Sequence, residues 1–504
     1  MVREQIATLV EEVEEKRAQS LTATLVPTPT AEYRSTRKLA RAATASAGPP
    51  APIPIPIPIP VLSGPRVLIW KQDPSVAEIG IRKAFLPTLA TTGPKDARIA
   101  TSGLPVVAPN ALGDFIQTPG TQEFDAVHTY AVVRMTLTMF QRALGAGAPA
   151  TLPWQWNVGS NAVPITVFPR HSNMMNAFYT RQASPPTGGG MLAFGFFPKP
   201  GPAPQPTVFT CRSFDIVAHE CGHAILDGLK PNWITSSTPQ TGALHEAFGD
   251  LTAIFLALSQ FDQVEAVIAQ TKSNLHDKTF LSDVAEEFGL ALGRPNGLRN
   301  ADNDLKLSQV GTEVHSLSQV FTGAIYDILA DIFAFERKLV RDDALTLYDR
   351  AAYLTGLLLH GILNAPASNA TFTDVGNKML LQTAADQASG KLTAAQATAY
   401  RNFIRNRFAV RQIVLASVPL SELAAALAKP VAADHQMEAS QHVSVTQTGG
   451  QNRAGCCGTM TSPEFTGVDE AIKKETESFL EEKQKFLEGI KALADETGRK
   501  KSTK

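Results

Sequence analysis

The chain has 504 residues, of which 44% are hydrophobic and 18% charged, so it is long enough for about three domains and can bury a large core. Its 46 basic and 47 acidic side chains give a net charge of −1, which argues against nucleic acid or an anionic membrane as the main partner, because both require clustered positive charge. The apolar runs are far shorter than the ~20 residues that cross a bilayer, so we expect no membrane span.

Residues 1–64 are predicted to form an N-terminal tail. Its first residues are acidic and have the apolar spacing of a short amphipathic helix, whereas a secretion signal needs a basic start and an apolar stretch. We therefore expect a cytoplasmic protein by default, with non-classical export as the alternative. Proline alternates with isoleucine from Pro52 to Pro60, which forbids a helix and predicts an extended linker; a ligand for a proline-binding module is the other reading.

Globular composition begins near residue 65. The first predicted strand covers 67–70, and helical periodicity follows over 123–145. Between that helix and residue 212 the chain is punctuated by proline and glycine, with strands expected within 162–168 and 191–197. Residues 65–212 are therefore predicted to form a β-rich N-terminal lobe.

From residue 214 to about 427 the apolar spacing is almost entirely helical. Loops are expected near 230–241, 293–313 and 364–371. Residues 213–428 are thus predicted to form an all-helical C-terminal lobe, and the fold class is α+β.

Residues 429–504 are predicted to form a flexible tail that ends in an amphipathic helix. Apolar residues recur there every seven positions among lysine and glutamate, which is typical of half a coiled coil. A partner could bind through this helix, and the alternative is a helix that lies on its own protein. The four residues of the stripe are Ile472, Phe479, Phe486 and Leu493.

The segment 215–226, DIVAHECGHAIL, carries the strongest chemical signal. His219 and His223 are four residues apart, so on a helix both imidazoles can bind one metal ion. Glu220 is about 100° round the helix, which places it beside the metal and within reach of a metal-bound water. Cys221 faces away and is interpreted as a small apolar filler.

A catalytic zinc ion needs three protein ligands and one open position. The segment 242–255, GALHEAFGDLTAIF, predicts a second helix with Glu246 and Asp250 on one face. We expect Glu246 to be the third ligand and Asp250 to accept the outward N–H of a ligating histidine. His245 is an alternative ligand, although it lies about 100° round the helix from Glu246.

These residues resemble the motifs of the thermolysin family of zinc metallopeptidases. In that family a zinc-binding helix is followed by a Glu-x-x-x-Asp helix, and the likeness covers about 66–427 of this chain. The resemblance implies a two-lobed fold with zinc in the cleft between a β-rich and a helical lobe. The residues that match the metal motifs are His219, Glu220, His223, Glu246 and Asp250.

Three further segments resemble parts of the family that contact the substrate. The segment 176–179, NAFY, is similar to its edge strand, which implies that Asn176 and Ala177 bind the substrate backbone. The pair at 298–299 implies that Arg299 binds a substrate carbonyl. The segment 314–316, VHS, implies that His315 stabilises the transition state.

The chain also departs from the family pattern. The aspartate that orients the active-site histidine is expected five residues before it, but Val310 stands there; Glu313, Asp302 or Asp304 could replace it. The expected tyrosine between the zinc helix and the third ligand is missing, and Trp233 is the nearest aromatic residue. Asp215 matches one calcium ligand of the family, but Ala257 stands where a second acidic residue is needed, so we expect no calcium.

The sequence thus predicts a zinc-dependent endopeptidase that acts on peptides or proteins, with Glu220 as general base. A zinc aminopeptidase is one alternative, because such enzymes share the three ligands; the Gly-x-Met-Glu-Asn segment that binds a free amine does not occur here. The other alternative is a catalytically silent scaffold that acts through its tails.

Overall fold

The computed structural model describes residues 64–415, except for 77–78, 87–90, 145–151, 157–162, 182–188, 200, 286–288, 290–296 and 298. These residues belong to one compact unit, Leu62–Lys504. The predicted Pro-Ile linker and the two amphipathic tail helices lie outside the described residues, and so does Leu298.

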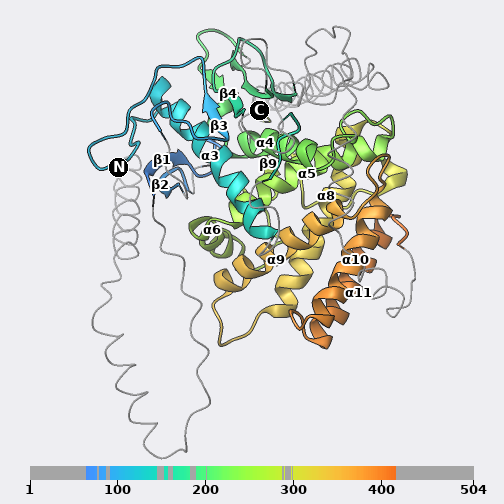
Figure 1. Ribbon diagram of the computed structural model, residues 1–504. Coiled ribbons are helices and arrows are strands. Elements are labelled where there is room, and N and C mark those ends of the chain that lie inside the picture. Colours follow the sequence, from blue (N-terminus) through green and yellow to red (C-terminus); the bar gives the residue numbers. More distant parts are fainter. Residues whose placement is uncertain are drawn as a thin grey trace, which may run out of the picture. The chain divides into compact units, whose positions relative to one another are not determined.

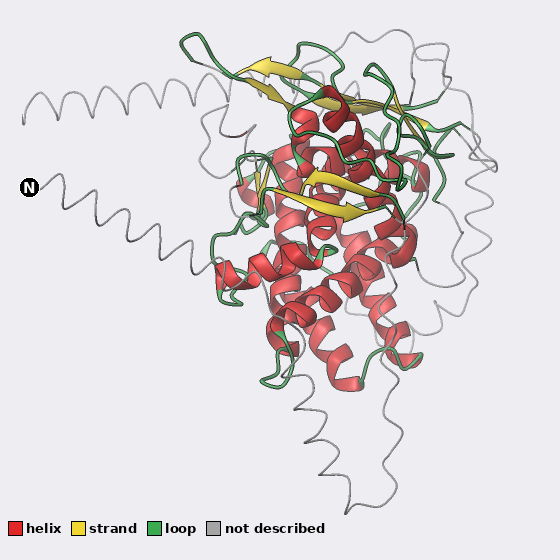
Figure 2. Ribbon diagram, turned by 90° about the vertical axis from the view of Figure 1, so that its left-hand side faces the viewer, coloured by secondary structure: helices red, strands yellow, loops and turns green. Residues whose placement is uncertain are grey.

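The fold is mixed α and β, with small sheets and a helical C-terminal region (Figures 1 and 2). The coarse prediction of fold class is therefore confirmed. Figure 2 shows several strands above the helices and one antiparallel pair in front of them. The helices consequently provide most of the core, and the strands cover part of it.

The largest sheet in the described residues has four strands in the order β3-β4-β6-β5. Strands β3, β4 and β6 are parallel neighbours, whereas β5 pairs antiparallel with β6 and occupies the edge. Two antiparallel pairs, β1-β2 and β7-β8, accompany this sheet. The strands are β1 (Arg66–Trp70), β2 (Ile81–Phe85), β3 (Ile99–Thr101), β4 (Ile165–Phe168), β5 (Ala177–Thr180), β6 (Met191–Phe194), β7 (Phe196–Pro198) and β8 (Thr207–Phe209).

One long helix precedes the helical region, and seven follow it among the described residues. The helices are α3 (Gln122–Ala143), α4 (Phe214–Leu229), α5 (Pro239–Leu258), α6 (Phe261–Thr271), α8 (Val314–Glu336), α9 (Asp343–Leu363), α10 (Phe372–Ala388) and α11 (Ala394–Val410). Helix α3 packs against β1 and against helix α4, so it joins the strands to the helical core. Short 3₁₀ turns, η2 (Thr210–Arg212) and η3 (Leu307–Gln309), precede α4 and α8.

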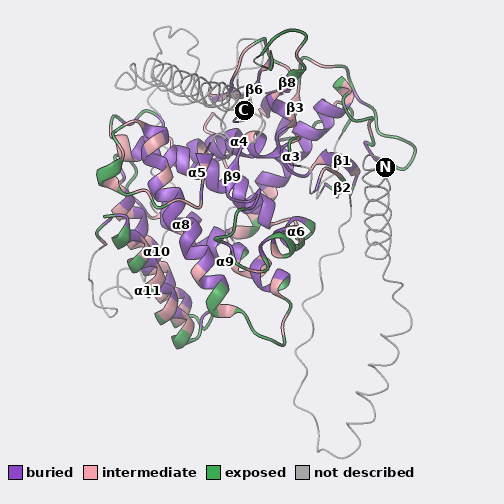
Figure 3. Ribbon diagram, turned by 180° about the vertical axis from the view of Figure 1, so that it is seen from behind, coloured by how far each residue is buried: buried purple, intermediate pink, exposed green. Residues whose placement is uncertain are grey.

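Helix α5 lies at the centre, packed against α4 and α8. Every residue of α5 from Thr241 to Leu258 is buried. Figure 3 shows that most of α4 and α8 is buried as well. A helix that is buried on all sides needs neighbours on all sides, and α4, α8 and α9 are among those that surround α5. By length and composition α8 could also cross a membrane, but 83% of its apolar window is buried inside the fold, as in the core helix of a soluble protein.

Several predicted elements are found close to their expected positions. The strand at 67–70 is β1, the helix at 123–145 is α3, and the loop at 364–371 separates α9 from α10. The strand expected within 191–197 is interrupted at Gly195. There the backbone changes partners, because the Gly195 N–H bonds to Asn176 O while Gly195 O accepts from Thr210 N.

The prediction of nearly continuous helix after residue 214 is wrong between α6 and α8, and α8 to α11 agree with it. Lys272 and Ser273 have φ angles of 49° and 66°, and this left-handed backbone ends the helix. The described residues between α6 and α8 include the strand pair β9 (Asp283–Val284) and β10 (Arg299–Asn300), together with turns and η3. The loop predicted to begin near 293 therefore begins about twenty residues earlier.

Candidate metal centre

Helices α4 and α5 pack closely because both carry glycine where they cross. A methyl group on Gly222 would lie 2.7 Å from Thr252 Oγ1, and one on Gly249 would lie 2.6 Å from the His219 ring. Both distances are too short for a real side chain, so glycine at these positions lets the His219 imidazole lie directly against α5. The N-terminus of α4 is fixed by Ser213, whose Oγ accepts from Ile216 N at 3.4 Å.

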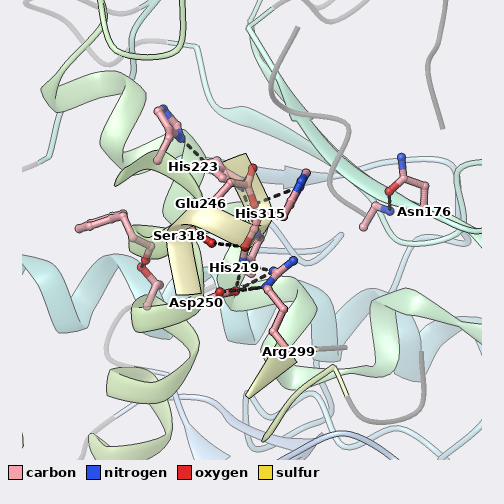
Figure 4. Close-up of polar contacts among 12 residues, drawn as sticks. Asn176, His219, His223, Glu246, Asp250, Arg299, His315 and Ser318 are labelled. Atoms are coloured by element: carbon pink, nitrogen blue, oxygen red, sulfur yellow. Dashed lines mark hydrogen bonds and ion pairs between the residues drawn. The ribbon is translucent and has the colours of Figure 1, made fainter. Parts of the chain in front are cut away.

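His219 and His223 on α4 meet Glu246 on α5 (Figure 4). The two Nε2 atoms are 3.0 Å apart, and the Glu246 oxygens lie 3.5 Å from His219 Nε2 and 3.6 Å from His223 Nε2. A tetrahedral ion with bonds of about 2.0–2.1 Å has ligand atoms roughly 3.3 Å apart. These three buried side chains can therefore hold a metal ion, as the sequence predicted.

The Glu246 carboxylate supports this assignment independently. It is wholly buried, and neither of its oxygens has a hydrogen-bond partner in the described structure. Burial alone would raise the pKa of Glu246, but His315, His223 and His219 hold it well below the usual value. A buried, ionised carboxylate without hydrogen bonds is costly, and a bound cation would satisfy it.

Asp250 lies one turn beyond Glu246 and contacts the far side of His219. Its Oδ1 is 3.0 Å from His219 Nδ1, so this nitrogen donates to the carboxylate and Nε2 faces the centre, as predicted. Burial lowers the pKa of His219, but the nearby carboxylates of Asp250 and Glu246 outweigh this effect and raise the pKa to about 9.

Arg299 is buried on β10 and is paired with Asp250 rather than standing alone. Its Nε and Nη2 lie 2.9 Å and 2.7 Å from the two Asp250 oxygens, and Nη2 is 3.5 Å from His219 Nδ1. Burial would raise the pKa of Asp250, but Arg299 and His219 lower it. The structure thus places Arg299 beside the metal group, which we define as His219, His223 and Glu246. Arg299 contacts Asp250, the residue that orients His219.

His245 is not one of the three residues that converge. Instead its Nδ1 lies 2.7 Å from Nδ1 of His223, on the side of that ring away from the centre. Its burial lowers its pKa to about 3, so the ring is neutral. The sequence offers His245 only as a competing ligand and does not predict this contact.

His315 lies in the first turn of α8, and its Nε2 is 3.4 Å from Glu246 Oε2. Its Nδ1 donates to Glu313 at 2.7 Å. Burial would raise the pKa of Glu313, but the hydrogen bonds from His315 and Ser316 lower it to about 2. Among the acids that the sequence left open, the structure selects Glu313; Asp302 contacts His276 instead.

Three other predicted residues lie on neighbouring elements. Glu220 is buried on α4 next to His219. Ala177 begins the edge strand β5, and Asn176 precedes it, with its Oδ1 accepting from Ala177 N at 2.9 Å. Asn176 stands apart from the metal group in Figure 4. Strand β5 is held against α4 because Tyr179 donates to Asp227 at 2.7 Å.

Residues that depart from the family pattern have other contacts. Trp233 is wholly buried, and its Nε1 donates to Pro366 O at 3.0 Å, so its N–H already has a partner in the core. Ala257 is buried on α5 and offers no ligand atom. The Cys221 thiol faces α3, 3.9 Å from Val133 O, in agreement with its interpretation as a filler.

A second group with ligand atoms close together consists of His276, Asp302 and Asp327. Asp327 is paired with Arg411 at 2.9 Å and lies 3.6 Å from Arg407. These two cations balance the negative charge that would attract a metal ion, and His276 is exposed. This group is therefore a weaker candidate than the buried one.

No protein-family model matches the chain, and a comparison with curated proteins gives no match.

Proposed function

We propose that this chain is a zinc-dependent endopeptidase with a thermolysin-like, two-lobed architecture. The observation that carries the proposal is the convergence of two imidazole nitrogens and a buried carboxylate without hydrogen bonds. Two nitrogen ligands and one oxygen ligand suit Zn²⁺, whereas Ca²⁺ and Mg²⁺ prefer oxygen alone. Three protein ligands also leave one position for water, which is typical of a catalytic zinc rather than a structural one.

Bound zinc would lower the pKa of water from about 15.7 to about 7 and polarise the scissile carbonyl. Glu220 is proposed to accept the proton of the attacking water and to deliver it to the departing amine. His315 would stabilise the developing oxyanion. Its Nδ1 is held by Glu313 and its Nε2 lies close to Glu246, which supports this role.

The substrate is proposed to be a peptide or protein in an extended conformation. Strand β5 is at the edge of its sheet and packs on α4. An edge strand offers unpaired backbone groups to an extended peptide, so Asn176 and Ala177 are proposed to bind the substrate backbone. Arg299 is proposed to bind a substrate carbonyl, as the resemblance to the family implies.

The test begins with the metal content of the purified full-length protein and with hydrolysis of a furylacryloyl dipeptide amide. This substrate has no free amine, so cleavage distinguishes an endopeptidase from an aminopeptidase. We expect Glu220→Gln to retain one zinc per chain and to lose about 10²–10⁴-fold in rate, and His223→Ala to lose the metal.

Three outcomes would contradict the proposal. A wild-type protein without zinc would remove its basis. A zinc-loaded wild type without hydrolysis of any peptide would favour the silent scaffold. A fully active Glu220→Gln variant would refute the role of Glu220.

A further inference from the structure

His223 is held between two consecutive residues of α5. Glu246 Oε1 lies 3.6 Å from its Nε2, and His245 Nδ1 lies 2.7 Å from its Nδ1. The rings of His223 and His245 have centroids 4.9 Å apart and an interplanar angle of 26°, so they meet edge to edge through their Nδ1 atoms. Because neighbouring helical residues project about 100° apart, His245 and Glu246 reach His223 from two different sides.

The two histidines of the metal group therefore have different partners. The outward nitrogen of His219 faces Asp250, a carboxylate that Arg299 holds in place. The outward nitrogen of His223 faces an imidazole, and His245 is wholly buried. A ligating histidine usually donates its outer N–H to a carboxylate, a backbone carbonyl or water, so a buried imidazole in this place is unusual.

We infer that His245 is a positioning residue, which accepts the Nδ1 proton of His223 and thereby keeps the Nε2 lone pair of His223 facing the metal. This inference rests on the proposed function, because it assumes that a metal binds there. A neutral imidazole carries one proton, and its other nitrogen has the lone pair. An acceptor fixed at Nδ1 therefore selects the tautomer of His223 that can bind a metal.

Three variants separate the hydrogen bond from the packing. His245→Asn keeps an acceptor, because Asn Oδ1 branches from Cγ as His Nδ1 does. His245→Leu keeps apolar bulk and removes the acceptor. His128→Leu is the matched control, since His128 is also wholly buried but lies on α3, and neither of its ring nitrogens has a side-chain partner among the described residues.

The measurement is the zinc dissociation constant of each full-length protein, by competition with a chromophoric chelator. Thermal unfolding of the metal-free proteins checks that each one folds. We expect His245→Leu to weaken zinc binding about 10–100-fold, His245→Asn to bind within a few-fold of the wild type, and His128→Leu to bind as the wild type does.

Two results would overturn the inference. One is a folded His245→Leu protein with the zinc affinity of the wild type. The other is a His245→Asn protein as weak as His245→Leu, because that would assign the effect to packing. A wild type that binds no zinc would instead overturn the proposed function itself, so the two failures are distinguishable.

Discussion

Glu313 joins the start of helix α8 to the orientation of His315. One of its oxygens accepts from His315 Nδ1 at 2.7 Å and from the His315 backbone N–H at 2.9 Å, and the other accepts from Ser316 N at 2.7 Å. A single carboxylate therefore caps the helix and fixes a ring that it carries in its first turn. The position of His315 consequently depends on where α8 begins.

The first prediction concerns this pair. Glu313→Ala should lower kcat of the proposed hydrolysis about 10–100-fold, because His315 loses its orienting acceptor, while zinc content stays at the wild-type level. Glu313→Gln, which keeps an acceptor oxygen, should lose less. Steady-state kinetics with parallel metal analysis checks both. A Glu313→Ala enzyme with unchanged kcat would show that His315 needs no orientation by residue 313.

The second prediction concerns Gly249. A methyl group there would lie 2.6 Å from the His219 ring, so Gly249→Ala should displace this ligand and weaken zinc binding at least about 10-fold. Gly356→Ala on α9 is the matched control, since its methyl group meets only Ala143 O, at 3.3 Å. Chelator competition measures both. Equal zinc affinity in Gly249→Ala and the wild type would mean that the α5 backbone shifts to make room for the methyl group while His219 keeps its position.

The third prediction is a pH dependence of stability. Burial and the positive charge of Arg212 lower the pKa of His128 from 6.5 to about 3. Between these values the unfolded chain binds the proton and the folded protein does not, so the contribution of His128 to stability is present above pH 6.5 and is lost as the pH falls toward 3. His128→Leu should remove this loss.

Urea unfolding of the metal-free proteins at pH 7 and pH 4.5 measures the effect. The wild type should lose more unfolding free energy over this interval than His128→Leu, and the remaining histidines cancel in the comparison. The same loss in both proteins would show that His128 is already protonated in the folded state or is accessible to water.

The candidate metal ligands could be predicted from the sequence because their geometry is local. His219 and His223 share a face of one helix, and Glu246 and Asp250 share a face of the next. The contact between His245 and His223 could not be predicted in this way. It depends on how α5 is turned against α4, which is set by tertiary packing at two glycines.

The secondary structure likewise could be predicted where local signals decide it, but not where tertiary packing does. Helix α3 was placed within two residues, because its periodicity is strong and Thr121 caps it. The region after α6 was predicted to be helical from its apolar spacing, but Lys272 and Ser273 take left-handed backbone that nothing in their side chains requires. Glu313 could be chosen over Asp302 and Asp304 only once the first residue of α8 was known.

The fourth prediction concerns Arg411, which follows α11 and is buried. Its guanidinium donates to Asn303 Oδ1 at 3.1 Å, to Leu305 O at 3.0 Å and to Asp327 at 2.9 Å. Arg411→Met should cost about 3–5 kcal/mol of unfolding free energy, because it leaves a buried carboxylate without its main partner. Urea unfolding measures this loss.

The control for Arg411 is an exposed ion pair. Arg337 lies 2.7 Å from Asp343 at the surface, and Arg337→Met should cost less than about 1 kcal/mol. Similar losses in the two variants would contradict the structural role assigned to Arg411, and so would a loss below about 1 kcal/mol for Arg411→Met.

The burial of α4 and α5 has a consequence for the lifetime of the protein. The metal ligands belong to the two helices at the centre of the core rather than to surface loops, so an ion bound there stabilises the whole helical core; at a free concentration one hundred times its dissociation constant it contributes about 2.7 kcal/mol. If the proposed function is correct, loss of the ion would favour unfolding as well as inactivation. An unfolded copy of the proposed peptidase would be a substrate of the copies that still hold their metal. Metal supply would then control the amount of this protein, through self-digestion, as well as its activity.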